Sequence, residues 1–149
     1  MKLITKALGK IEISEDALLT IPEGLFGFEQ YTKYALIDSE YEPFIWLQSC
    51  EEPDIAFLIV DPFLISTEYE TDIDDAALAK IGITKPEDII IMTIVTVPND
   101  GSHITANFQG PIVINKHNRM CMQAILNDNR WSTKFDIVEA LSSKGAKKC

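Results

Sequence analysis

The sequence predicts a mainly β protein, an antiparallel closed or nearly closed β-barrel with one short helix near residues 74–81. Apolar and polar residues alternate with a period of two through much of the chain, as side chains do along a strand. Turn-forming residues separate these runs. Predicted strands do not alternate with predicted helices, which disfavours a parallel doubly wound sheet. About eight antiparallel strands with one short helix are typical of a barrel.

The clearest strand predictions are three runs rich in branched residues, at 55–60, 89–97 and 111–114. Each is almost continuously apolar and is bounded by Pro, Asp, Asn or Gly, which indicates a strand covered on both faces. Pro111 has no N–H donor, so we expect it to begin its strand. Residues 11–14 alternate and predict a further strand near the start of the chain.

Two later segments, 103–108 and 119–126, also alternate. A hairpin turn is predicted at residues 98–101, because an Asp-Gly pair suits the positive φ of a hairpin loop. A second turn is predicted at 109–111. The expected apolar faces consist of Ile104, Ala106 and Phe108 in the first segment, and of Met120, Met122, Ala124 and Leu126 in the second.

One helix is predicted, at residues 74–81. Asp72 is its expected N-cap, a lysine lies in its last turn, and Gly82 follows it as the C′ residue. Residues 84–87 resemble a second cap followed by at most one turn. Periodicity does not decide whether residues 135–141 form a strand or a helix.

The length of 149 residues fits a single domain, predicted at residues 1–141, followed by a polar Lys-rich tail at 142–149 that we expect to be disordered. No apolar run approaches the ~20 residues that cross a bilayer, and no secretory signal is evident. We therefore expect a cytoplasmic protein. The odd, widely spaced cysteines give no sign of a disulfide framework. Cys50 and Cys121 are expected in the core and Cys149 at the surface.

Negative charge is concentrated in one part of the chain. Twelve carboxylates and no Lys or Arg lie between Tyr34 and Ala79, out of 23 acidic and 13 basic residues in all. Such a segment attracts cationic surfaces and repels nucleic acid and anionic lipid. Acidic composition also serves solubility alone. The complete absence of positive charge here favours a basic macromolecular partner, with no direct nucleic-acid or membrane binding.

Residues suited to catalysis or metal binding are scarce. The only histidines, His103 and His117, are expected to be solvated surface residues. The sequence contains no zinc, calcium or nucleotide-binding motif. The aspartates at 72, 74 and 75 are explained more simply by a helix N-terminus than by a calcium site. We therefore predict no catalytic residue, no cofactor and no metal.

Three segments place polar residues beside apolar ones, at 46–48, 61–63 and 107–111. Their structural interpretation is a core tryptophan, a strand stop at Asp-Pro, and a turn in which an asparagine caps free backbone groups. Their functional interpretation is a rim of hydrogen-bonding groups around an apolar docking groove. For each segment taken separately, the sequence favours the structural interpretation.

Four segments, in this order and spacing, resemble the FliW family of flagellar assembly factors. They are IPEGLFGFE (21–29), PFIWLQS (43–49), IAFLIVDP (55–62) and TANFQGPIVIN (105–115). The likeness spans about residues 1–141. The chain departs from the family at 118–123, where a Gly-Lys-Gln-like lead into the next strand is expected, and in its Lys-rich tail.

The resemblance implies a regulatory role without catalysis. Proteins of this family bind CsrA, a small basic dimer that blocks translation of flagellin messenger RNA, and they also bind flagellin. Free factor captures CsrA, and translation resumes; accumulated flagellin sequesters the factor, and CsrA represses again. The resemblance also implies that CsrA is bound away from its RNA surface. Two alternatives are a chaperone-like flagellin binder with a minor regulatory role, and a flavin-dependent enzyme on a small β-barrel.

The matched segments and the acidic block supply the predicted partner-binding residues. We expect carboxylates between residues 40 and 75 to guide CsrA toward the protein, and apolar groups to hold it. The predicted residues are Phe26, Phe28, Phe44, Trp46, Gln48, Glu51, Glu52, Asp54, Asn107, Gly110, Pro111 and Asn115.

Overall fold

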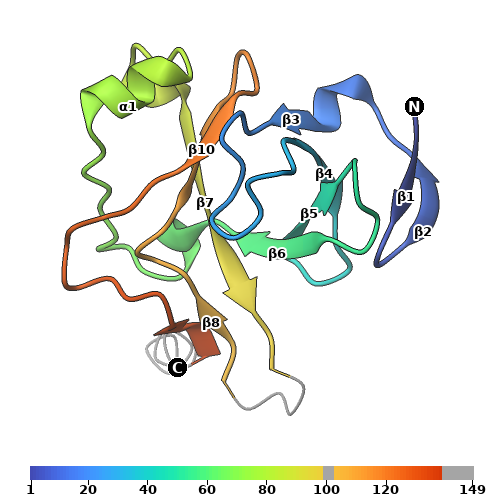
Figure 1. Cartoon of the computed structure of the whole chain (residues 1–149). Coiled ribbons are helices and arrows are strands. Elements are labelled where there is room, and N and C mark those ends of the chain that lie inside the picture. Colours follow the sequence, from blue (N-terminus) through green and yellow to red (C-terminus); the bar gives the residue numbers. More distant parts are fainter. Residues whose placement is uncertain (99–102, 139–149) are drawn as a thin grey trace.

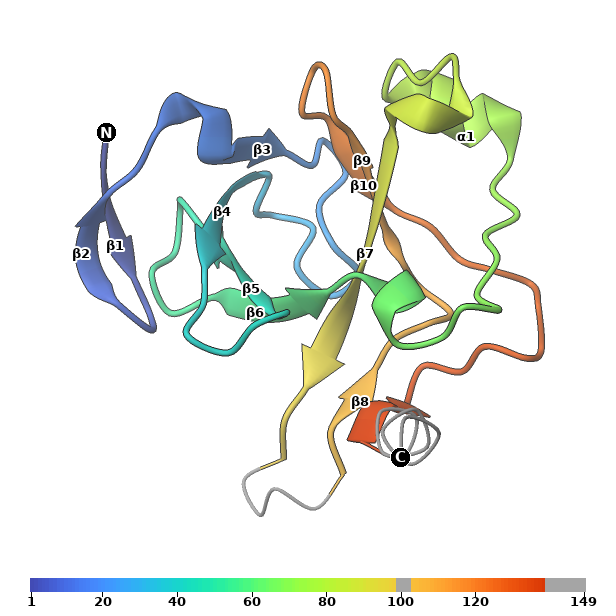
Figure 2. The same cartoon turned by 180° about the vertical axis from the view of Figure 1, so that it is seen from behind.

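The structure is a computed structural model that describes residues 1–98 and 103–138, and it is mainly β (Figures 1 and 2). Its strands are β1 (Lys2–Thr5), β2 (Gly9–Glu12), β3 (Leu18–Thr20), β4 (Lys33–Asp38), β5 (Ile45–Ser49), β6 (Ala56–Val60), β7 (Ile89–Thr96), β8 (Thr105–Ala106), β9 (Ile112–Asn115), β10 (Cys121–Gln123) and β11 (Phe135–Asp136). Its helical segments are α1 (Asp75–Lys80) and the 3-10 turns η1 (Glu15–Ala17), η2 (Pro62–Leu64) and η3 (Pro86–Asp88). In the part of the chain that is described, no helix has the length and apolar character needed to cross a membrane.

Nine strands form one antiparallel sheet, whose main path runs β10-β9-β7-β6-β5-β4-β3. The long strand β7 joins the two halves of this path, because it pairs with β9 at its start and with β6 and β8 further along. Strand β11 adds to β8 beside the main path. Strands β1 and β2 form a separate hairpin on the side of the molecule away from α1 (Figures 1 and 2).

The predicted barrel is not confirmed, because the sheet keeps two ends. A single isolated parallel bridge, Thr20 with Met120, joins the β3 end to the β10 end. In it the Thr20 N–H donates to the Arg119 carbonyl at 3.0 Å. A parallel ladder would next need a donor two residues further on. That position is Pro22, which has no N–H, so the ladder cannot extend from this bridge toward the end of β10.

The alternation of side chains divides the core into clusters on opposite faces of the sheet. On β7, Ile91 and Val95 join one cluster, and Met92 joins the other. The first cluster also receives Phe108 and Trp131 from later segments of the chain. The predicted faces are confirmed. Ala106, Phe108 and Leu126 belong to the first cluster, and the other predicted residues pack against it, namely Ile104, Met120, Met122 and Ala124.

The predicted helix is confirmed as α1, with one correction to its start. Asp74, not Asp72, is the N-cap, and its carboxylate accepts the Ala76 N–H at 3.2 Å. The chain leaves the helix through Gly82 at φ +77°, as predicted. Residues 84–87 lead into η3, a 3-10 helix of one turn, but Lys85 provides no side-chain cap.

Several other predictions can be compared with the structure. Pro111 directly precedes β9, whose four residues are all buried. In the segment 135–141, β11 is followed by a helical conformation at residues 137–138, and residues 139–141 lie outside the described ranges. The hairpin turn at 98–101 joins two strands that do pair, although residues 99–102 lie outside the described ranges. The tail at 142–149, with Cys149, also lies outside them.

Candidate functional site

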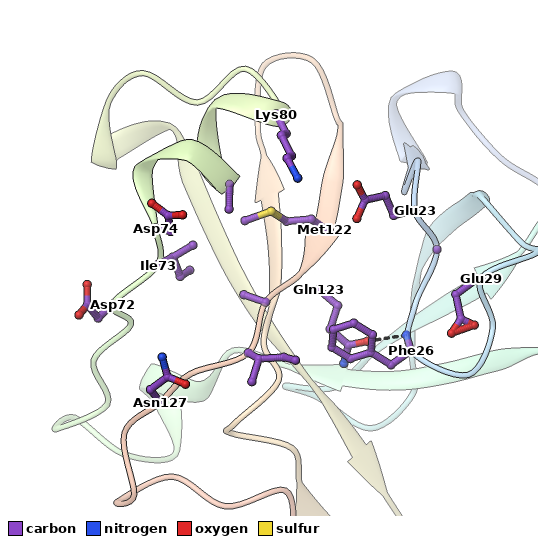
Figure 3. Close-up of a pocket in the computed structure, with 14 residues that line it drawn as sticks. Glu23, Phe26, Glu29, Asp72, Ile73, Asp74, Lys80, Met122, Gln123 and Asn127 are labelled. Carbon is purple, nitrogen blue, oxygen red and sulfur yellow. Dashed lines mark hydrogen bonds between the residues drawn. The ribbon is translucent and has the colours of Figure 1, made fainter.

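A groove of about 640 Å³ lies beside strand β10, between the segment that leads into α1 and the loop that follows β3 (Figure 3). Met122, Gln123 and Ile125 belong to its β10 side. Ile73 lines it from the α1 side, and Phe26 from the loop. Three segments that are distant in sequence therefore meet at this groove.

The loop at residues 24–29 holds its shape through glycine conformations and backbone hydrogen bonds. Gly24 has φ +70°, and a Cβ there would lie 2.5 Å from the Glu29 Cα, so only glycine fits. The Glu29 carboxylate accepts the Gly27 N–H at 2.8 Å. The side-chain carbonyl of Gln123 accepts the Phe26 N–H at 2.9 Å. The loop is thereby fixed to β10, and the Phe26 side chain stays 53% exposed.

Gln123 also connects β10 to the turn before β9. Its amide nitrogen donates to the Gly110 carbonyl at 3.0 Å. In the same turn, Asn107 accepts the Gly110 N–H at 2.8 Å. A Cβ on Gly110 would lie 2.9 Å from the Asn107 amide nitrogen and 3.2 Å from that of Gln123. The turn and the groove loop therefore share one hydrogen-bonded support, centred on Gln123.

The α1 side of the groove is tied to the turn between β9 and β10. The Ile81 carbonyl, just after α1, accepts from the Asn115 amide at 2.9 Å and from the Asn118 amide at 3.0 Å. Asn115 is buried and also accepts the His117 N–H at 2.9 Å. Two side-chain amides thus fix the end of the helix to the same sheet edge that lines the groove.

The groove is strongly negative and partly apolar. Four carboxylates line it, from Glu23, Glu29, Asp72 and Asp74, against the single ammonium of Lys80 (Figure 3). Exposed apolar surface lies among them, including Ile125 at 65% exposure. Exposed apolar side chains within a charged rim are typical of a protein-binding surface.

The predicted aromatic residues do not come together. Phe26 lines the groove, whereas Phe28 packs into the core edge-on against Phe57, at a ring distance of 5.1 Å. Phe44 packs against the cluster on the opposite face of the sheet, and Trp46 packs against a third cluster beside the β1–β2 hairpin. Phe44 and Trp46 therefore lie apart from Phe28, because successive residues at 44–47 face opposite sides of the sheet.

Gln48 and the acids after it form a self-contained turn away from the groove. The Gln48 side chain is 1% exposed, accepts the Lys6 N–H and donates to three carbonyls. The Glu51 carboxylate accepts the Lys33 and Thr32 N–H groups, and these bonds lower its pKa. Glu52 is half-buried and Asp54 is exposed.

The remaining predicted residues are not among those that line the groove. Asn107, Gly110 and Pro111 form the turn that Gln123 supports, and Asn115 holds the end of α1. Sequence reasoning missed Gln123 and Ile125, which lie within or next to an alternating strand. The signal that could have located them is the edge position of β10, which depends on the pairing order of the strands.

Other polar groups have structural partners. His103 lies 3.1 Å from the Asp136 carboxylate, and His117 lies 2.7 Å from that of Asp88; both imidazoles are mostly exposed, as predicted. Cys121 is buried as predicted, and burial raises the pKa of its thiol to about 12. Within residues 1–98 and 103–138, no cluster of His, Cys, Asp or Glu is arranged to hold a metal.

Comparison with known proteins gives a consistent result. The family model described as FliW protein matches residues 2–137. A flagellar assembly factor FliW of Treponema denticola is 46% identical over 145 residues, which cover 97% of this chain and 99% of that protein. One of Treponema pallidum is 42% identical, with 98% and 97% covered. A crystal structure of the flagellar assembly factor FliW superimposes with a TM-score of 0.84 at 37% identity, covering 92% of this chain and 96% of that one. The chain belongs to the FliW family.

Proposed function

We propose that this flagellar assembly factor is a protein-binding regulator. It captures CsrA and so relieves repression of flagellin mRNA translation, and flagellin releases this control by binding the factor in turn. The observation that carries the proposal is the acidic groove with exposed apolar side chains, in a chain of the FliW family. It acts in the cytoplasm, where both translation and unassembled flagellin are found, and it acts without catalysis.

The charges support a basic partner. The chain has a formal net charge of −10, and four of its carboxylates line the groove together with one lysine. Complementary charge raises the rate of encounter with a cationic protein and suppresses binding of anionic ones. The field that attracts CsrA would repel messenger RNA, so the factor would act on the repressor and not on its transcript.

A reconstituted translation assay tests the proposal. A reporter carrying a flagellin leader is repressed by CsrA, and the factor is then added in increasing amounts. We expect translation to recover once the factor matches CsrA, and repression to return when excess flagellin follows. Absence of recovery at several equivalents of factor would overturn the regulatory proposal.

A chaperone-like flagellin binder is the second candidate. A second hollow of about 540 Å³, which adjoins the groove at Ile73, is lined by Phe63 and Ile90 among others, with Asp61 as its single carboxylate. Such apolar surface suits a flagellin segment more than a basic repressor. Titration calorimetry with each partner separates the two candidates, because the chaperone requires tight flagellin binding and weak CsrA binding. A flavin-dependent enzyme would instead purify with a flavin absorbance band.

A further inference from the structure

We propose that CsrA inserts an extended, basic segment into the groove, where it adds a strand to the open edge of β10. This inference rests on the function proposed above and specifies its binding mode. It assigns binding to backbone groups of β10 as well as to side chains, as in β-strand addition to a sheet edge.

The hydrogen bonds of residues 120–126, which include β10 and the chain that follows it, show which peptide groups face the groove. Met120 accepts the Asn115 N–H at 2.9 Å, Ala124 donates to Pro111 at 2.9 Å, and Leu126 donates to Gln109 at 2.8 Å. Even-numbered residues therefore turn their backbone groups toward β9. In an antiparallel ladder the residues between them turn theirs to the other side. Gln123 and Ile125 thus direct their N–H and C=O groups outward.

No described strand covers this part of the edge. β10 is the end of the main path, and its outer side is bridged only at Met120. Pro22 stops that bridge from extending toward Gln123. Unpaired strand edges readily accept another strand, and those left exposed are commonly shielded by charge. The open stretch suits a short added strand of about four residues.

The two sides of the groove fix the sequence pattern of the incoming segment. Side chains of an added strand alternate between the two faces. On one face they meet Met122 and Ile73, which favour an apolar side chain, with Asp72 and Asp74 beside Ile73 (Figure 3). On the other face they meet Phe26, with Glu23 and Glu29 nearby (Figure 3). A segment that alternates apolar residues with Lys or Arg would satisfy both.

A substitution at Ile125 isolates the backbone contribution. Ile125→Pro removes the outward N–H but leaves the Ala124 and Leu126 bonds to β9 in place, and an exposed strand edge tolerates proline. Ile125→Ala is the matched control, because it removes the side chain and keeps the N–H. We expect the proline variant to bind CsrA about tenfold more weakly than the alanine variant. Equal affinities would overturn the added strand.

Amide exchange on the unsubstituted protein provides a second measurement that needs no variant. On CsrA binding, we expect the Gln123 and Ile125 amides to slow by about tenfold or more, because they gain a partner. The Ala124 and Leu126 amides, already bonded to β9, should change much less. Equal change at odd and even positions would contradict strand addition and indicate general burial.

A charge-matched pair of quadruple variants tests why the segment must be basic. The groove variant combines Glu23→Gln, Glu29→Gln, Asp72→Asn and Asp74→Asn, and the last of these keeps a good N-cap. The control combines Glu15→Gln, Glu40→Gln, Glu68→Gln and Glu87→Gln, all at exposed positions. We expect affinity for CsrA to fall about tenfold more in the groove variant.

The outcomes separate this inference from the function on which it rests. If the unsubstituted protein does not bind CsrA, the proposed function fails, and this inference fails with it. If it binds, but both quadruple variants lose affinity equally, the groove carboxylates only shield the strand edge and the basic segment is wrong. If it binds and Ile125→Pro matches Ile125→Ala, the added strand alone is wrong.

Discussion

The turn at residues 49–55 and the groove beside β10 are both acidic, but they use their polar groups in different ways. In the turn, the Ser49 hydroxyl accepts two N–H groups, and the Glu51 carboxylate accepts two more. In the groove, no hydrogen bond among the described residues is formed by the carboxylates of Glu23 and Asp72. The polar side chains of the turn are used in hydrogen bonds within the protein, whereas carboxylates and backbone groups at the groove remain available to bind a partner.

The difference teaches that the density of acidic residues does not locate a binding surface. The turn lies inside the Lys- and Arg-free segment, yet its best-placed carboxylate is engaged by backbone N–H groups of Thr32 and Lys33. Two of the groove carboxylates, those of Glu23 and Glu29, lie outside that segment altogether. Folding gathers them with Asp72 and Asp74 from the other side of the sheet edge. Availability for binding depends on which hydrogen bonds the fold has already formed.

The largest expected effect is the loss of stability on truncating Gln48. Gln48→Ala removes a buried side chain that bonds to the backbone of Lys6 and to three carbonyls. We expect the free energy of unfolding to fall by about 3 kcal/mol, from the unpaired groups and the cavity. Urea unfolding measures it. Gln109→Ala, at a half-buried position where no hydrogen bond of the side chain is described, is the control and should change stability by less than ~0.5 kcal/mol.

If Gln48 is scaffold, its alanine variant should still bind CsrA with unchanged affinity at a temperature where it is folded. A loss of CsrA affinity in the folded variant would show that Gln48 contributes to binding. The turn and the groove would then no longer differ in function.

The second largest expected effect is a loss of affinity for CsrA on truncating Phe26 in the groove. Phe26→Ala removes an aromatic ring that is 53% exposed, on a loop held by backbone bonds to Gln123 and Glu29. We expect CsrA affinity to fall about tenfold with little change in stability, because exposed aromatic anchors carry much of an interface. Phe63→Ala, at an exposed position outside the groove, is the control. Equal losses would mean that the groove is not the contact surface.

The strands were predictable from sequence because the period of two survives wherever one face is buried. Runs 89–97 and 111–114 appear as β7 and β9, and the alternating faces enter the expected cluster. The helix was predictable from its caps, but the choice between Asp72 and Asp74 was not, since both are good capping residues. Closure of the sheet was not predictable, because it depends on the donor missing at Pro22 where β3 approaches β10.

The predicted partner-binding residues overlap little with the groove. Phe26, predicted from the matched segment at 21–29, is among the described residues that line it. Gln48 and Asn115 were also chosen, yet both are buried in hydrogen bonds to backbone groups. The sequence shows that a polar residue lies next to apolar ones. It does not show whether the fold places a backbone group within hydrogen-bonding distance of that side chain. That distinction needs the strand pairing.

A smaller effect is expected from the acids of the turn that remain available. Charge reversal at Glu52 and Asp54 leaves the described hydrogen bonds of the turn in place, whereas reversal at Glu51 would break two of them. We expect Glu52→Lys with Asp54→Lys to slow CsrA association by about threefold at low salt, and by less at ~0.15 M, where charges are screened within about 8 Å. Stopped-flow mixing measures the rate. Glu15→Lys with Glu87→Lys is the charge-matched control, and an equal slowing would show that only net charge matters.

The smallest effect is a pH dependence from the engaged carboxylate. Hydrogen bonds from Lys33 and Thr32 hold the pKa of Glu51 below its ordinary value of 4.5. A lowered pKa in the folded state adds stability above that ordinary value, and this stability is lost as the pH falls through the folded-state pKa. Glu51→Gln keeps an oxygen acceptor but cannot ionise. The stability gap between the two proteins should therefore be constant near neutral pH and close below about pH 4.5, as followed by thermal unfolding. A gap that persisted unchanged into acid would mean that ionised Glu51 does not hold this turn, and the contrast with the groove would then rest on Gln48 and Ser49 alone.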